Sequence, residues 1–149
     1  MADIFDSLTP FEVLTLTIIG EARGEPIESQ VGVGCVIRNR LLMDKYKDYK
    51  DVCLRPNQFS CWNPKDVNRN YLLQLASQML KTPFADLSLK QCQFIANGIV
   101  SWQVADNVNG ARFYIENTVF AKIGVDPNLD WAKGYKNIAI RGHHTFFSL

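Results

Sequence analysis

The segment with the clearest chemical potential is residues 20–25, which read Gly-Glu-Ala-Arg-Gly-Glu. Glu21 follows Thr17 by four residues and Ile18 by three, so these three side chains share one face of a helix. A carboxyl group held against apolar surface tends to stay protonated, because desolvation disfavours its anion. Such a group can serve as a general acid near neutral pH. The alternative is an ordinary helix-end glutamate paired with a nearby arginine.

A second group of candidates lies in residues 58–63, where amide and hydroxyl side chains are mixed with large aromatic rings. Polysaccharide grooves use this mixture, because aromatic faces cover the C–H surface of a sugar and amides bind its hydroxyls. We predict substrate contacts from five of these residues: Gln58, Phe59, Ser60, Trp62 and Asn63. In the alternative interpretation Phe59 and Trp62 pin a long loop to the core, which leaves Gln58 and Ser60 as the functional members.

Other reactive side chains are weaker candidates. Glu25 stands between a glycine and a proline, a pattern typical of a turn, and we interpret it as structural. His143 and His144 are neighbours on an expected strand, so they should point to opposite faces and make a poor metal pair. None of the four cysteines has zinc-site spacing, so we predict neither a metal nor a cofactor. Cys53 and Cys61 flank one loop and could form a disulfide in an oxidising compartment, although free thiols are favoured.

The elements that must position these residues are mostly helical. Thr9, Pro10 and Glu12 form a capping box that predicts a helix over residues 10–22. Apolar periodicity predicts further helices over 26–42, 66–81 and 88–104, with a solvated loop at 44–51. After residue 109 short strands are predicted at 111–115, 137–140 and 144–147. We expect one domain spanning residues 1–149, an α+β fold that is mainly α, with a small C-terminal β element.

Composition excludes several classes of protein. The chain has 149 residues, of which 47% are hydrophobic, enough to bury a core without a metal or disulfide. Sixteen basic and fifteen acidic residues leave a net charge of +1, which argues against an electrostatically driven nucleic-acid binder. No uncharged apolar run approaches the about 18 residues of a membrane span. The first residues carry acids and lack the basic start of a secretory signal.

The motif at residues 20–25 resembles the opening motif of the SleB-like cell wall hydrolases, the catalytic domains of spore cortex-lytic enzymes. The resemblance continues through Gln-Val-Gly-Val-Gly at 30–34 and Asn-Arg at 39–40. It resumes at Gln-Phe-Ser-Cys-Trp (58–62), at Asn-Gly-Ala-Arg-Phe-Tyr (109–114), at Trp131 and at Gly-His-His-Thr-Phe (142–146). It implies a lysozyme-like fold that cleaves peptidoglycan glycan strands, with Glu21 as the catalytic acid.

The same resemblance adds binding residues around this acid. Tyr114 and His144 match family positions and are expected to line the cleft. The family's Asp-Pro-Thr-x-Gly-Ala element is Asp-Asn-Val-Asn-Gly-Ala here, at residues 106–111. Asn109 thus stands where the family has threonine and is expected to contact the sugar, and Asp106 is the nearest candidate for a second acid.

The activity predicted from these residues is that of a lytic transglycosylase or muramidase acting on peptidoglycan. Glu21 would protonate the glycosidic oxygen between N-acetylmuramic acid and N-acetylglucosamine, through an oxocarbenium-like transition state. The rival hypothesis is a non-catalytic peptidoglycan-binding or virion structural module of the same fold. A Cys/His amidase or peptidase is weaker, because no cysteine stands in a recognisably exposed, basic setting.

The expected setting follows from the features that the sequence lacks. No secretory signal and no peptidoglycan-binding repeat is recognisable, which favours a phage endolysin or a virion-associated lysin. We expect a monomer that is made in the host cytoplasm and acts on the cell wall or from a virion. Neither a nucleic-acid partner nor membrane insertion is expected.

Overall fold

Helix α1 (Pro10–Ala22) is the centre of the helical part in this computed structural model, which describes residues 4–81 and 87–149. The Thr9 hydroxyl accepts from the Glu12 amide, and the Glu12 carboxylate accepts from the Thr9 amide, so the predicted capping box is confirmed. Every residue from 13 to 19 is buried, because α2, α3, α4 and α5 all pack against α1. A helix that is covered on all sides gives its last turn a fixed position.

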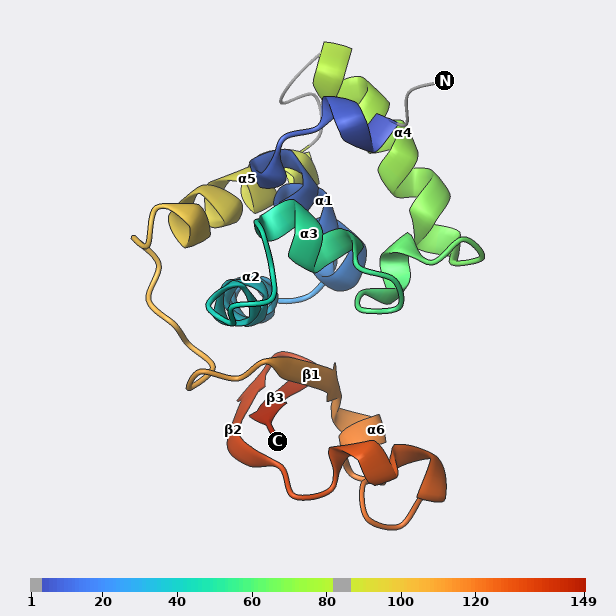
Figure 1. The fold of residues 1–149 in the computed structure, drawn as a ribbon, viewed down its shortest axis with the longest axis vertical. Coiled ribbons are helices and arrows are strands. Elements are labelled where there is room, and N and C mark those ends of the chain that lie inside the picture. Colours follow the sequence, from blue (N-terminus) through green and yellow to red (C-terminus); the bar gives the residue numbers. More distant parts are fainter. Residues whose placement is uncertain (1–3, 82–86) are drawn as a thin grey trace.

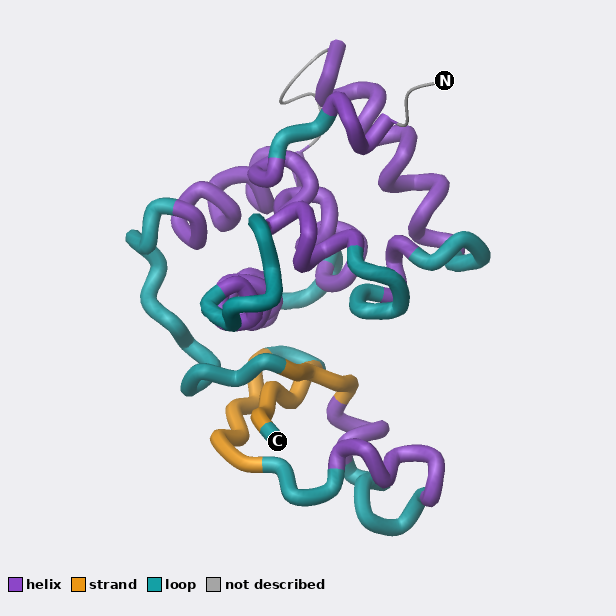
Figure 2. The backbone as a smooth tube through the Cα atoms, in the orientation of Figure 1, coloured by secondary structure: helices purple, strands orange, loops and turns teal. Residues whose placement is uncertain are grey.

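The helices around α1 are α2 (Ile27–Leu41), α3 (Tyr49–Leu54), α4 (Val67–Lys81) and α5 (Leu87–Val100), shown in purple in Figure 2. Short 3-10 turns η1 (Ile4–Ser7) and η2 (Ser60–Trp62) complete this part. The prediction of a loop over residues 44–51 was wrong at its C-terminal end, where α3 begins at Tyr49. The Asp48 carboxylate caps this helix by accepting from the Asp51 amide at 2.8 Å. The helix predicted to reach residue 104 ends at Val100, because Trp102 adopts a left-handed φ of 62°.

The C-terminal part is a small antiparallel sheet, built from strands close to those that the sequence predicts. Its strands are β1 (Phe113–Glu116), β2 (Lys136–Arg141) and β3 (His144–Ser148), in the order β1-β3-β2. Two short elements that the sequence analysis missed, α6 (Asn117–Phe120) and η3 (Pro127–Ala132), lie between β1 and β2. The predicted class, mainly helical with a C-terminal β element, is confirmed.

Helix α2 connects the helical part with the sheet, which lies below it in Figure 1. A Cβ atom on Gly32 would lie 2.5 Å from the Phe146 ring, so only glycine lets β3 come this close. Two side chains of α2 also hold the chain where it enters β1. Asn39 donates to the Ala111 carbonyl at 2.9 Å, and Arg40 donates to the Arg112 carbonyl at 2.7 Å. These contacts fix the position of β1 relative to α1.

The four cysteines are buried and form no disulfide: Cys35, Cys53, Cys61 and Cys92. Burial raises the pKa of the Cys53 thiol to about 12 and that of the Cys61 thiol still further. A thiol that stays protonated is a poor nucleophile, so these two groups do not favour Cys/His chemistry.

Within the part of the chain that the structure describes, no helix has the length and apolarity of a membrane span.

Candidate active site

Glu21 lies in the last turn of α1, half-buried, with its carboxylate held by donors from two other elements. The Tyr114 hydroxyl donates to Oε1 at 2.5 Å. The Ser60 hydroxyl and the Cys61 backbone amide approach Oε2 at 3.4 and 3.3 Å. A Cβ atom on Gly20 would lie 2.8 Å from the Cys61 side chain, so glycine at this position allows η2 to reach the carboxylate. The structure therefore brings together three of the residues predicted for the site.

Tyr114 supplies the shortest of these hydrogen bonds. It stands on β1 opposite Phe146 of β3, and its ring meets the ring of His144 edge-on at 5.2 Å. Burial raises the pKa of Tyr114 well above its ordinary value, and the negative charge of Glu21 raises it further. The phenol therefore remains a donor at neutral pH and orients the carboxyl group of Glu21.

His144 and His143 converge on one carboxylate, that of Glu25. His143 Nδ1 lies 2.6 Å from Glu25 Oε2, and His144 Nδ1 lies 3.4 Å from Oε1 and 2.7 Å from the Ser29 hydroxyl. The expectation that the two histidines point to opposite faces was wrong, because β3 begins at His144 and His143 belongs to the preceding turn. Glu25 fastens this turn to the one between α1 and α2.

Among residues 4–81 and 87–149, no group of three or more potential ligands could hold a metal ion.

The aromatic residues of the 58–63 segment are buried. Phe59 is 2% exposed and Trp62 is 6% exposed, and the Trp62 indole donates to the Thr17 hydroxyl at 2.9 Å. A stacked sugar needs an exposed ring face, so this burial favours the alternative in which Phe59 and Trp62 pin the loop to the core, and substrate contact by these two rings stays a prediction. Gln58 and Ser60 are exposed and remain available, while the Asn63 backbone amide closes η2 by donating to the Ser60 carbonyl.

Asp106 has a local partner for each of its oxygens. Oδ1 accepts from the Val108 amide at 2.8 Å, and Oδ2 accepts from the Gly110 amide at 2.8 Å and from Asn39 at 3.3 Å. In the two described stretches no hydrogen bond connects this carboxylate with the Glu21 group. Asn109 lies exposed in the same turn with a left-handed φ of 55°, and its sugar contact stays a prediction.

With this geometry in place, comparison with known proteins gives a clear relationship. Residues 24–147 match the cell wall hydrolase family, Hydrolase_2. The chain belongs to the cell wall hydrolase family. The matched range includes Ser60, Tyr114 and His144 and begins three residues after Glu21.

A solved structure has the same fold as this cell wall hydrolase. It is the catalytic domain of the germination-specific lytic transglycosylase SleB from Bacillus anthracis. The two chains superimpose with a TM-score of 0.56 over 93% of each, at 20% sequence identity. A likeness at this identity establishes the fold. A comparison with curated protein sequences finds no match.

Arg40 is a residue of this cell wall hydrolase that the sequence analysis did not single out for the site. It is 8% exposed, donates to Gln58 Oε1 at 3.3 Å, and lies over the Phe59 ring at 4.9 Å. It thereby supports the same segment that supplies Ser60 to Glu21. A charged residue within the buried stripe of the predicted 26–42 helix was the signal that could have identified it.

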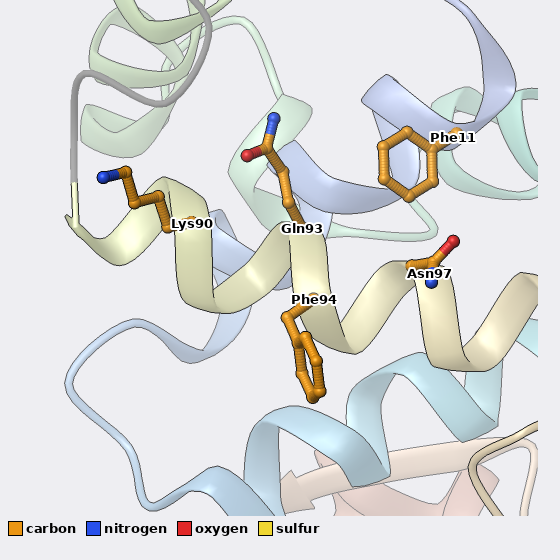
Figure 3. A pocket seen from close by; sticks show the side chains of 5 residues that line it. All are labelled: Phe11, Lys90, Gln93, Phe94 and Asn97. Atoms are coloured by element: carbon orange, nitrogen blue, oxygen red, sulfur yellow. The ribbon is translucent and has the colours of Figure 1, made fainter.

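A pocket of about 320 Å³ lies elsewhere on the hydrolase, between the start of α1 and α5. Figure 3 shows Phe11 on α1 and the four lining residues of α5, namely Lys90, Gln93, Phe94 and Asn97. These five side chains contain no carboxyl, imidazole or thiol group. The pocket therefore lacks the acid that glycosidic cleavage requires, in contrast to the Glu21 group.

Proposed function

We propose that this cell wall hydrolase cleaves the glycan strand of peptidoglycan as a lytic transglycosylase, with Glu21 as its acid and base. One observation carries the proposal: the Glu21 carboxylate accepts hydrogen bonds from the Tyr114 hydroxyl, the Ser60 hydroxyl and the Cys61 backbone amide. These donors come from two elements, η2 and β1, and leave the group half-buried. The SleB domain of the same fold is named as a lytic transglycosylase, which supports this reaction type.

In the first step Glu21 gives its proton to the glycosidic oxygen that leaves C1 of the muramoyl residue. The C1–O bond breaks, positive charge develops at C1 and the ring oxygen, and Glu21 becomes a carboxylate. The three donors then stabilise that carboxylate, because hydrogen bonds to an ionised acceptor are strong.

In the second step the muramoyl 6-hydroxyl attacks C1, and Glu21 takes the hydroxyl proton as a base. The C1–O6 bond forms, a 1,6-anhydro ring results, and Glu21 is protonated again without consuming water. This route is favoured over a two-carboxylate mechanism because Glu25 is bound to His143 and Asp106 is bound to its own loop. A muramidase would instead use water and release reducing ends.

Purified peptidoglycan digested by the wild-type protein and by Glu21→Gln tests the proposal. General-acid catalysis is worth about 10²–10⁴-fold, so the variant should lose at least that much activity while keeping its melting temperature within a few degrees. Mass spectrometry of the wild-type digest should find 1,6-anhydromuramoyl ends. Cleavage by Glu21→Gln at the wild-type rate would refute Glu21 as the acid, and reducing ends would refute the transglycosylase reaction.

The same digestion addresses the rival hypothesis. A non-catalytic peptidoglycan-binding module would release no glycan fragments in either reaction. The phage setting expected from the sequence stays a prediction.

A further inference from the structure

A pocket of about 270 Å³ carries three cationic side chains, those of Arg40, Lys45 and Arg112. Tyr46 and Phe113 contribute aromatic surface to its wall, and Gln58 contributes an amide. Among the described residues that line it, no side chain is acidic. A concave site lined by three cationic side chains and no acidic ones is suited to an anionic ligand.

Arg40 lines this pocket and is buried, and it forms no ion pair with any described residue, although the charge of Glu21 lies near enough to favour its charged form. Its hydrogen bonds go to neutral oxygens, the Arg112 carbonyl and the Gln58 amide, and the ion pairs of the described chain do not include it. Buried charges in proteins are normally paired, because leaving water is costly for an ion. Burial lowers the pKa of Arg40, yet a guanidinium stays charged in proteins. An incoming carboxylate would supply the missing counter-charge.

Arg38, two residues earlier on α2, shows that a buried arginine without an ion pair is not by itself a binding site. It is also buried and unpaired in the described structure, at 1% exposure, but the Trp102 ring covers its guanidinium at 4.2 Å. Arg40 also lies over aromatic rings, those of Phe59 at 4.9 Å and Phe113 at 5.5 Å, but unlike Arg38 it lines a pocket.

Lys45 and Arg112 form the rim and are exposed. Within residues 4–81 and 87–149 neither side chain makes a hydrogen bond or ion pair, and the Lys45 ammonium lies 5.4 Å from the Tyr46 ring centroid. Both groups can therefore turn toward a ligand without breaking an existing bond.

The pocket adjoins the Glu21 group through two shared segments. Gln58 lines the pocket, and Ser60 in the same short segment donates to Glu21. Phe113 lines the pocket, and Tyr114 directly after it donates to Glu21. A polymer bound at Glu21 can therefore place a group of a neighbouring residue or branch in this pocket.

We propose that the Arg40–Lys45–Arg112 pocket binds a carboxylate carried on the lactyl branch of a muramoyl residue. This inference rests on the proposed function. The hydroxyl and acetamido groups of the glycan strand are neutral, so the anions of peptidoglycan are the carboxylates on the muramoyl branches. Arginine suits them because its planar fork matches a carboxylate with two hydrogen bonds. The carboxylate is either the lactyl group itself or one on its peptide.

The test measures affinity in the Glu21→Gln background, so that cleavage does not interfere. Three tetrasaccharide probes are used: one with free lactyl carboxylates, one with lactyl-linked dipeptides, and uncharged chitotetraose. Lys45 and Arg112 are replaced together by glutamine, which keeps much of their length and removes both charges. Lys136→Gln on β2 is the matched control, because Lys136 is exposed and lies outside the pocket. Arg40 is left intact because it also holds β1.

The double variant should bind at least one charged probe about tenfold more weakly, as expected for lost charge-assisted hydrogen bonds. Its affinity for chitotetraose should match that of the control. Loss with the free-lactyl probe alone assigns the lactyl carboxylate, because that carboxyl is an amide in the dipeptide probe. Loss with the dipeptide probe alone assigns the peptide carboxylate, and loss with both shows that the pocket accepts either. Unchanged affinity for both charged probes would overturn the proposal, as would an equal loss for chitotetraose.

These outcomes are separable from those for the proposed function. Failure of the wild-type protein to cleave peptidoglycan, with charge-dependent binding retained, would refute the activity and keep the pocket. Cleavage with charge-independent binding would refute the pocket and keep the activity.

Discussion

The Tyr114 hydroxyl lies 2.5 Å from Glu21 Oε1, although 93 residues separate the two in sequence. The interaction joins the first strand of the sheet to the last turn of the central helix. The sheet therefore does more than cover α2, because it supplies the closest donor to the candidate acid. Since burial and the charge of Glu21 raise the pKa of Tyr114, this donor persists through the neutral and mildly alkaline range.

Tyr114→Phe should lower kcat/KM by roughly tenfold to a hundredfold, the range for a hydrogen bond to a charged group. The ring remains, so the melting temperature should change little. Because the pKa of Tyr114 is raised, ionisation of the wild-type phenol should produce no loss of activity below about pH 10. Steady-state kinetics on soluble glycan fragments across pH checks both points. Wild-type kcat/KM in the variant would show that this hydrogen bond is irrelevant to catalysis.

Trp62→Phe should reduce stability and leave KM unchanged. The substitution removes the indole donor to Thr17 and some buried volume, a loss of about 1–2 kcal/mol in the free energy of unfolding. Chemical denaturation measures that loss, and kinetics at low temperature compares KM for the folded enzyme. A raised KM with unchanged stability would restore Trp62 as a sugar-stacking residue.

Asp106→Asn should act on stability more than on chemistry. An asparagine can place its carbonyl toward only one side, so its amide would face either the Val108 donor or the donors of Gly110 and Asn39, at a cost of about 1–3 kcal/mol. The kcat of the folded fraction should stay within a few-fold of wild type. A severe fall in kcat, with reducing-end products from the wild-type enzyme, would establish a second catalytic carboxylate instead.

The pair formed by His143 and Glu25 should stabilise the protein in a limited pH window. The hydrogen bond to Glu25 raises the pKa of His143 above 6.5. Burial alone would raise the pKa of Glu25, but the hydrogen bonds from His143 outweigh burial and lower the pKa of Glu25 below 4.5. The histidine contribution is complete below its unfolded pKa and fades as pH rises through the folded pKa. The glutamate contribution is complete above its unfolded pKa and fades toward acid.

The melting temperature of wild type should therefore exceed that of His143→Ala most between about pH 4.5 and 6.5. The difference should shrink above this window and below it. His144 is present in both proteins, so its own titration largely cancels. A difference that grows steadily with pH would show that a charged His143 does not contribute.

Local chemistry made much of the helical part predictable from sequence. Thr9 and Glu12 close a capping box between residues three apart, and Asp66, directly before α4, accepts from the Asn68 amide at 2.9 Å. The end of α5 was missed because Trp102 takes a left-handed conformation, and the Val104 amide turns back to the Gly98 carbonyl.

The sequence by itself determined the central helix and marked Glu21, because apolar periodicity and a compact motif need only neighbouring residues to be recognised. The tertiary structure decided which groups meet that carboxylate. Ser60 reaches it while Trp62, two residues later, is buried, because the three-residue period of a 3-10 turn points these two side chains in different directions, and only the packing of η2 on α1 decides which of them faces the core. Tyr114 meets Glu21 because the close fit of Phe146 on Gly32 and the bonds of Asn39 and Arg40 place β1, and such long-range contacts exist only once the chain has folded.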